Sequence, residues 1–309
     1  MSIKVGIGLG AWPFAHHGPE SFWRFAERCE SLGIDSLWFI DRLIGNGPYL
    51  DPLTLMASMA ARTRTIKFGP SVLALSLRNP VLLAKEIATI DYLSGGRIIP
   101  AVGLGADIEG EAEAAGINPQ ERGRRTDEAI QVMRRLWTDD TVTFEGRYFQ
   151  LHDVRLQPKP VQKPCPPVWI GGRSEAALKR LARLGDGWLA ASITPIEIAS
   201  GLTVLEGYLD ESDRSIDTGH IGVIMACCVA RNKTEAMERA GDHLFRRRPD
   251  VAVDEYNAIG NTQDSVSLAR RYIEAGVSKF ILRLACPPEL VDEQLDIIAR
   301  EIIPEIESS

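Results

Sequence analysis

The sequence predicts an α/β protein, a single (β/α)8 TIM barrel, and two observations favour this fold class. First, a junction recurs in which a helical segment ends at Gly33, Gly185 or Gly276 and an apolar strand follows at once. Glycine just past a helix end readily adopts the left-handed conformation that closes the helix. Second, the strands that follow are nearly continuous apolar runs, which is typical of parallel strands buried on both faces. Roughly eight such strands alternating with helices fit a closed barrel better than an open sheet.

The pattern of apolar residues places the elements in the alternating order that a barrel needs. We expect strands at residues 3–9, 34–40, 66–73, 97–104, 167–171, 187–191, 220–230 and 279–284. We expect helices at 19–32, 51–63, 80–94, 121–137, 174–184, 195–211, 232–246 and 263–275, and a closing helix at 288–303.

Two stretches interrupt this alternation. Residues 106–120, after the fourth strand, are acidic and contain glycine, and they follow a strand end where binding loops occur. Residues 141–168, near the fifth strand, alternate around Glu145-Gly146-Arg147 and then run through several prolines. This pattern indicates a hairpin and an extended connection. Neither insertion is long enough for a domain, so we expect residues 1–309 to form one domain.

The composition is that of an ordinary globular protein, with 45% apolar and 25% charged residues. A net charge of −7 without a basic stripe argues against a nucleic-acid partner. Five cysteines without CxxC spacing argue against a disulfide scaffold or a metal site and fit a reducing compartment. Neither a leader-like segment nor an apolar run of about 18 residues occurs, so we expect a cytoplasmic protein without a membrane partner. The oligomeric state stays open, with a homodimer as one option.

Candidate binding residues follow from the position of the active site in such barrels, which lies in the loops after the strands. Asp41 follows the second strand and is either a site residue or a side chain that caps a turn. Gly103 and Gly105 end the fourth strand, where two glycines let a flat ligand approach the backbone.

The strongest chemical signal is the turn Gly171-Gly172-Arg173-Ser174, which follows the strand at 167–171. Backbone N–H groups at a helix N-terminus, a hydroxyl and a guanidinium converge there, which is typical of a phosphate or other anion site. The alternative is an ordinary capped turn without a ligand.

Candidate proton donors are His16 and His17, in the loop after the first strand, and Asp107, in the first insertion. Histidines in a loop at the barrel mouth can titrate near neutral pH, although a role at the surface is the alternative. The sequence contains no HExxH zinc motif, nucleophile elbow or phosphate loop.

Four distinctive segments occur in order within residues 3–190: Asp51-Pro52-Leu53-Thr54-Leu55 through Arg62-Thr63, Ser71-Val72-Leu73 with Arg78-Asn79-Pro80 and Asp91 through Arg97, Glu121-Arg122-Gly123 with Leu136-Trp137, and Pro158-Lys159-Pro160 through Gly172, ending at Gly185-Asp186-Gly187-Trp188. Together they resemble the luciferase-like monooxygenase superfamily, especially its coenzyme F420-dependent branch. Residues after 190 resemble it only loosely.

The resemblance implies a tricyclic cofactor at the barrel mouth, supported by a bulge on the third strand with a non-prolyl cis peptide at Ser71–Val72. It also implies cofactor roles for Asp41, for Gly103 and Gly105, and for Gly171, Gly172 and Ser174, while Arg173 is a candidate from the residue pattern of the turn alone. Two departures concern the sugar-phosphate dehydrogenases of this group. They carry a histidine after the aspartate and a glutamate after the glycine pair, where this chain has Arg42 and Ala106.

Three functions follow from this resemblance. The first is an F420-dependent oxidoreductase that moves a hydride between the deazaflavin and a small organic substrate. The second is an FMN-dependent monooxygenase, in which reduced flavin activates oxygen. The third is a non-catalytic flavin-binding protein, which the missing histidine and glutamate keep open. The departures argue against sugar-phosphate oxidation.

Overall fold

Parallel strands form a closed barrel in the computed structural model, which describes residues 2–16, 18–106, 108–244 and 248–307. The sheet runs in the order β3-β2-β1-β12-β10-β9-β8-β5-β4, so neighbours along the chain are neighbours in space. β4 pairs with β5, and a bridge from Phe68 to Ile98 joins β3 to the segment before β5, which closes the ring. The barrel strands are β1 (Lys4–Leu9), β2 (Ser36–Phe39), β3 (Lys67–Pro70), β4 (Leu73–Ala74), β5 (Ala101–Gly103), β8 (Trp169–Gly171), β9 (Gly187–Ala191), β10 (Ile221–Val229) and β12 (Lys279–Leu284).

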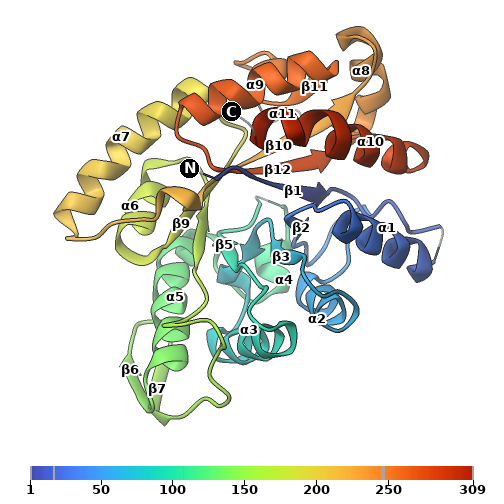
Figure 1. Cartoon of the computed structure of the whole chain (residues 1–309). Coiled ribbons are helices and arrows are strands. Elements are labelled where there is room, and N and C mark those ends of the chain that lie inside the picture. Colours follow the sequence, from blue (N-terminus) through green and yellow to red (C-terminus); the bar gives the residue numbers. More distant parts are fainter. Residues whose placement is uncertain (1, 17, 107, 245–247, 308–309) are drawn as a thin grey trace.

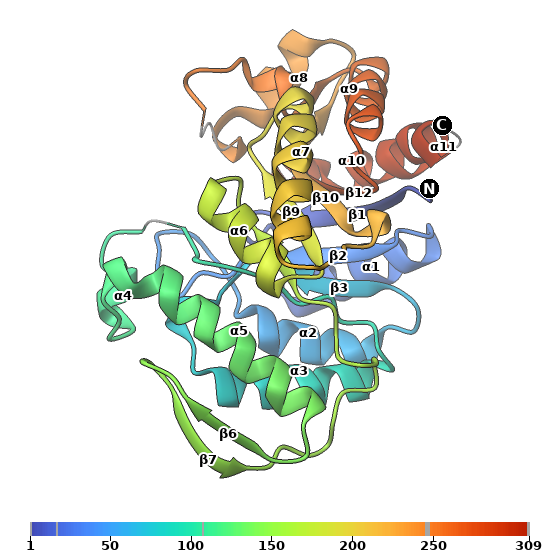
Figure 2. The same cartoon turned by 90° about the vertical axis from the view of Figure 1, so that its left-hand side faces the viewer.

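Helices surround the barrel, as Figures 1 and 2 show from two sides. Several begin at residues suited to a helix start: Asp51, Asn79, Ser174, Thr194 and Asn261 each accept a hydrogen bond from an N–H of the first turn. The helices are α1 (Pro19–Ser31), α2 (Pro52–Arg62), α3 (Pro80–Ser94), α4 (Glu111–Ala114), α5 (Arg122–Thr138), α6 (Glu175–Leu184), α7 (Pro195–Glu211), α8 (Lys233–Ala240), α9 (Thr262–Glu274), α10 (Val291–Ile297) and α11 (Ile303–Glu307).

The barrel interior is a packed core and not a channel. Trp38 and Trp169 occupy it together with Leu189, Ile224 and Ile281. Glycines on four strands make room for the two indoles. A Cβ atom at Gly6 or Gly69 would lie within 3 Å of Trp38, and one at Gly187 or Gly222 would lie within 3 Å of Trp169. The outward faces of the same strands pack against the helices in the main core.

The structure confirms the barrel and corrects several elements. The third strand is interrupted between β3 and β4, and the fourth is regular only over β5. The helix expected at 232–246 ends at Ala240, because the chain leaves the helix at Gly241 with φ of 40°. A short strand, β11 (Ala258–Gly260), was not expected and pairs with β10. The closing helix continues to Glu307 through a π-helical segment over Ile298–Ile302.

Two segments carry structure outside the barrel strands. Residues 106–120 contain the short helix α4, and residues 141–168 contain an antiparallel hairpin of β6 (Val142–Glu145) and β7 (Gln150–Val154). Figure 2 shows this hairpin projecting beside α5, away from the barrel strands. A connection with cis prolines at Pro158 and Pro164 returns the chain to β8.

Polar side chains seal the N-terminal end of the barrel. The Lys279 ammonium forms an ion pair with Asp35 and lies 5.9 Å from the centre of the Trp38 indole ring. Burial lowers the pKa of Lys279 to about 8, although Asp35 acts in the opposite direction. Arg97 donates hydrogen bonds to the carbonyls of Ala60, Thr63 and Ile66, and so closes the turn between α2 and β3.

Candidate functional site

The interruption of the third strand lies at the C-terminal mouth of the barrel. Ser71 still donates its N–H to the Phe39 carbonyl at 2.7 Å, and the Ser71–Val72 peptide that follows is cis, as the resemblance implied. The Val72 side chain turns inward over the core of the barrel. A Cβ atom at Gly103 would lie 2.8 Å from Val72 Cγ2, and one at Gly171 would lie 2.7 Å from Val72 Cγ1. The two glycines therefore make room for Val72, which forms an apolar floor at the mouth.

Asp41 holds the loops of this mouth together. Its side chain is 5% exposed, and one carboxylate oxygen accepts the N–H of Ala74 at 2.8 Å. The other oxygen pairs with Arg78 at 2.8 Å, and Arg78 also reaches Asp51 at 3.0 Å. Asp41 thus fixes the segment that follows Val72, and its carboxylate is already engaged by the protein.

The turn after β8 presents the N-terminus of α6. Gly172 has φ of 111°, a conformation that favours glycine, and its carbonyl accepts the Trp188 indole N–H at 2.7 Å. Ser174 caps the helix by accepting the N–H of Ala177 at 3.3 Å. The carboxylate of Glu175, in the first turn, is held by Lys179 at 2.7 Å and by the Tyr208 hydroxyl at 3.0 Å. These contacts draw the carboxylate toward α7, and they lower the pKa of Glu175.

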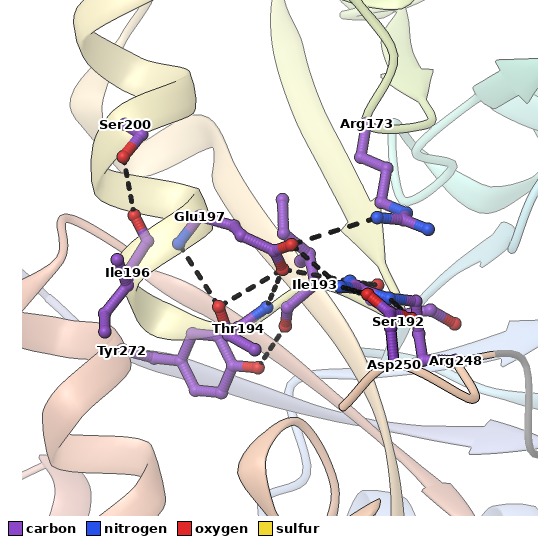
Figure 3. A network of polar contacts seen from close by, with 10 residues as sticks. All are labelled: Arg173, Ser192, Ile193, Thr194, Ile196, Glu197, Ser200, Arg248, Asp250 and Tyr272. Carbon is purple, nitrogen blue, oxygen red and sulfur yellow. Dashed lines mark hydrogen bonds and ion pairs between the residues drawn. The ribbon is translucent and has the colours of Figure 1, made fainter. Parts of the chain in front are cut away.

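Arg173 extends away from this helix end. Figure 3 shows its guanidinium directed toward Glu197, with 4.0 Å between Arg173 Nη1 and Glu197 Oε1. The Arg173 side chain is 42% exposed. Glu197 also pairs with Arg248 at 2.9 Å and completes a capping box with Thr194 at the start of α7. Hydrogen bonds that Arg248 donates to Asp250 and Glu197 raise the pKa of Arg248, whose side chain is 6% exposed.

The three candidate proton donors are not brought together. His16 is exposed in the loop before α1, and it does not line either cavity described below. His17 and Asp107 lie outside the residues that the structure describes. Arg42, which replaces the family's histidine, lies 6.0 Å from the centre of the Tyr49 ring. Ala106, which replaces the glutamate, accepts a hydrogen bond from Arg122 at its carbonyl.

Two cavities flank Trp12 beyond the C-terminal end of β1. The larger one, of about 120 Å³, lies between the ends of β1 and β12 and is lined by apolar side chains together with Asp242 and His243. The smaller one lies toward β2 and is lined by Phe39, Tyr49 and Leu50 among others. Asp242 and His243 could not be selected from the sequence, because both fall inside the helix expected at 232–246. Gly241 was the available signal that this helix ends earlier.

Within the described ranges, no group of three His, Cys, Asp or Glu side chains is arranged to hold a metal ion. No helix of that part of the chain is long and apolar enough to span a bilayer. All five cysteines are buried and free, and burial raises the pKa of Cys286, which lines the larger cavity, to about 12.

The model of the luciferase-like monooxygenase family matches residues 2–295. An F420-dependent glucose-6-phosphate dehydrogenase of Amycolatopsis mediterranei is 32% identical over 315 residues, covering 90% of this chain and 92% of that protein. A 4-hydroxyprotoasukamycin monooxygenase of Streptomyces nodosus subsp. asukaensis is 29% identical, covering 90% and 76%. The solved structure of an F420-dependent secondary alcohol dehydrogenase has the same fold, with a TM-score of 0.85 at 23% identity and 99% coverage of both chains.

Proposed function

Because this chain belongs to the family of luciferase-like monooxygenases, we propose that it is an oxidoreductase that uses coenzyme F420 and a small organic substrate. The observation that carries the proposal is the apolar floor that Val72 makes against Gly103 and Gly171. A flat tricyclic ring needs such a surface, and a relative that covers 90% of this chain is an F420-dependent glucose-6-phosphate dehydrogenase. When bound, F420 supplies hydride transfer, while the protein binds, orients and excludes water.

The residues at the mouth fit such a cofactor. Ser71 and Val72 would support the ring, and Asp41 would act through the loops that it holds. Gly105 brings the backbone beside Ala74, since a Cβ there would lie 2.8 Å from the Ala74 methyl group. Gly171, Gly172 and Ser174 would hold a phosphate at the N-terminus of α6, where N–H groups without intrahelical partners favour an anion. The contact between Arg173 and Glu197 is long, at 4.0 Å, so turning toward a phosphate costs Arg173 little.

The substrate differs from that of the sugar-phosphate dehydrogenases. Arg42 and Ala106 stand where those enzymes carry their acid/base pair, and the Arg42 guanidinium lies over the Tyr49 ring. We therefore assign the proton transfer to other groups, and His16, His17 and Asp107 remain candidates.

An FMN-dependent monooxygenase is the second candidate, because a relative that is 29% identical over 90% of this chain is a monooxygenase. A flavin-binding protein without catalysis is the third, because the acid/base pair is missing. Both alternative functions would place their cofactor at the same barrel mouth.

The phosphate site is tested by two changes at Ser174 in the full-length protein. Ser174→Asp keeps a side chain that caps the helix but adds a negative charge, so the F420 affinity should fall at least tenfold. Ser174→Ala removes the cap and should lower the free energy of unfolding by about 1 kcal/mol. Fluorescence titration with F420 measures the affinity, and urea denaturation measures the stability. Unchanged F420 affinity in Ser174→Asp would remove the phosphate from this turn.

The remaining expectations concern the surroundings of the protein. We propose one domain acting in the cytoplasm, and the buried free thiols support a reducing compartment.

A homodimer is also proposed, since Leu82, Tyr92 and Leu93 are exposed on α3. Light scattering in solution tests it. A nucleic-acid partner is not proposed, given the net charge of −7.

A further inference from the structure

The larger cavity beside β1 is apolar except for one polar edge. It lies beyond the C-terminal ends of β1 and β12, at the end of the barrel where Val72 also lies. Its apolar walls come from Leu9, Trp12, Pro13, Leu284, Cys286 and Val291. A concave apolar site with one or two polar groups is the usual form of a small-molecule site.

The size of the cavity limits what it can hold. Its volume is about 120 Å³. An engineered cavity of about 150 Å³ in another protein binds benzene, so this one has room for a group near the size of a five-membered ring. Among the described residues that line it, Asp242 carries the carboxylate, and this negative charge would oppose an anion.

Two arginines at this end of the barrel, Arg78 and Arg248, are committed to other partners. Arg78 pairs with Asp41 and Asp51, and Arg248 pairs with Glu197 and Asp250. Releasing either guanidinium to a substrate phosphate would leave carboxylates without their partner. The apolar walls and the Asp242 carboxylate therefore favour an uncharged group in this cavity.

The segment that carries His243 is anchored on both sides. Before it, α8 packs Ala236 and Ala240 into the core, and after it the Leu244 side chain is buried. Farther on, Arg248 donates hydrogen bonds to Glu197, Asp250 and the Ser192 carbonyl, which ties Arg248 itself to the start of α7 (Figure 3). His243 is exposed and thus in contact with solvent, to which a proton can pass.

We propose that this cavity binds the apolar group of an uncharged alcohol or ketone and that His243 exchanges the proton of its oxygen. The inference rests on the proposed function, with the deazaflavin as the hydride partner. In the oxidation, the carbinol C–H bond breaks with its electron pair passing to the deazaflavin, and the O–H proton passes to an imidazole nitrogen of His243. A carbonyl forms, and His243 returns the proton to water. In the reduction every step is reversed.

The site is tested by filling the cavity. Ala11 is exposed and lines the cavity, so Ala11→Trp should fold normally and obstruct it. Ala61→Trp, at an exposed position of α2, is the matched control. Calorimetry with cyclopentanone, and F420 titration of each variant, report the two affinities separately. We expect at least tenfold weaker cyclopentanone binding in Ala11→Trp alone, with F420 affinity unchanged in both. Equal cyclopentanone affinity in the two variants would overturn the inference while leaving the cofactor assignment intact.

The proton role is tested by His243→Gln, with the exposed His152→Gln as control. His243→Gln should lower kcat for cyclopentanol oxidation at least a hundredfold, with little change in KM and in F420 affinity. Added imidazole should restore part of the rate in His243→Ala. Full activity in His243→Gln, or equal losses in both glutamine variants, would exclude the role. Failure of the wild-type protein to bind F420 would instead contradict the proposed function, and cyclopentanone binding would then still report on the cavity.

Discussion

The two ends of the barrel differ in how they use polar residues. At the N-terminal end, Asp35 and Lys279 plug the interior and Arg97 satisfies the carbonyls of a turn. At the C-terminal end, ion pairs such as Asp41–Arg78 tie loops to one another around an apolar floor and an open cavity. At the N-terminal end the charged side chains close the barrel, whereas at the C-terminal end they leave space that a ligand can fill. Stability and binding should therefore respond to different substitutions.

The largest effect is expected at the closed end. Asp35→Ala leaves the buried Lys279 ammonium without its partner, and breaking a buried pair in this way costs about 3–5 kcal/mol of unfolding free energy. Urea denaturation measures this loss. Lys67→Ala is the matched control, because Lys67 is 49% exposed and lies 3.4 Å from the same carboxylate. It should cost less than about 1 kcal/mol. Similar losses in both variants would show that burial of Lys279 does not set the effect.

Glu30 provides a pH-dependent test of the same end. Burial acts to raise its pKa, but hydrogen bonds from the N–H groups of Thr65, Ile66 and Arg64 outweigh it and hold the pKa at about 2. Since the folded pKa lies below the ordinary 4.5, this stabilisation is present above pH 4.5 and is lost as the pH falls toward 2.

Glu30→Gln should lower the free energy of unfolding by about 1–2 kcal/mol at pH 7, a figure reduced for partial exposure. The difference from the wild type should shrink between pH 4.5 and pH 2. Denaturation at a series of pH values measures it, with the exposed Glu27→Gln as control. A difference that is constant with pH would contradict the assigned cause.

At the open end, Asp41→Asn should act on binding more than on stability. The amide still accepts the Ala74 N–H, but the charge that holds Arg78 is lost, so the loop after Val72 loosens. We expect about tenfold weaker F420 binding, equal to about 1.4 kcal/mol. Asp51→Asn is the control, because asparagine caps α2 equally well and Arg78 keeps Asp41. Equal F420 affinities in the two variants would mean that Asp41 does not position the site.

Much of the fold could be predicted from the sequence because the barrel repeats one local rule, a glycine-terminated helix followed by a buried strand. Elements that break this rule were missed for physical reasons. β11 is only three residues long, which is too short for any periodicity to appear. The helix expected at 232–246 ends at Ala240 instead, because Gly241 has φ of 40°, which excludes continuation of the helix. Glycine alone in a sequence does not show which conformation it adopts.

The site was harder to predict than the fold. The resemblance located the Ser71–Val72 cis peptide, but it could not show that Gly103 and Gly171 contact Val72, because that contact joins three strands. Asp242 and His243 approach Trp12 from 230 residues farther along the chain, and only the closure of the barrel brings them together. Local patterns carry no information about such a contact.

Binding of F420 at the mouth of this barrel is measured by titrating the full-length protein with F420 and, separately, with FMN. Quenching of cofactor fluorescence reports both affinities under the same conditions. We expect saturable F420 binding that Ser174→Asp weakens at least tenfold. The affinity for FMN should be much lower than the affinity for F420. Tight FMN binding without F420 binding would contradict this expectation and select the monooxygenase.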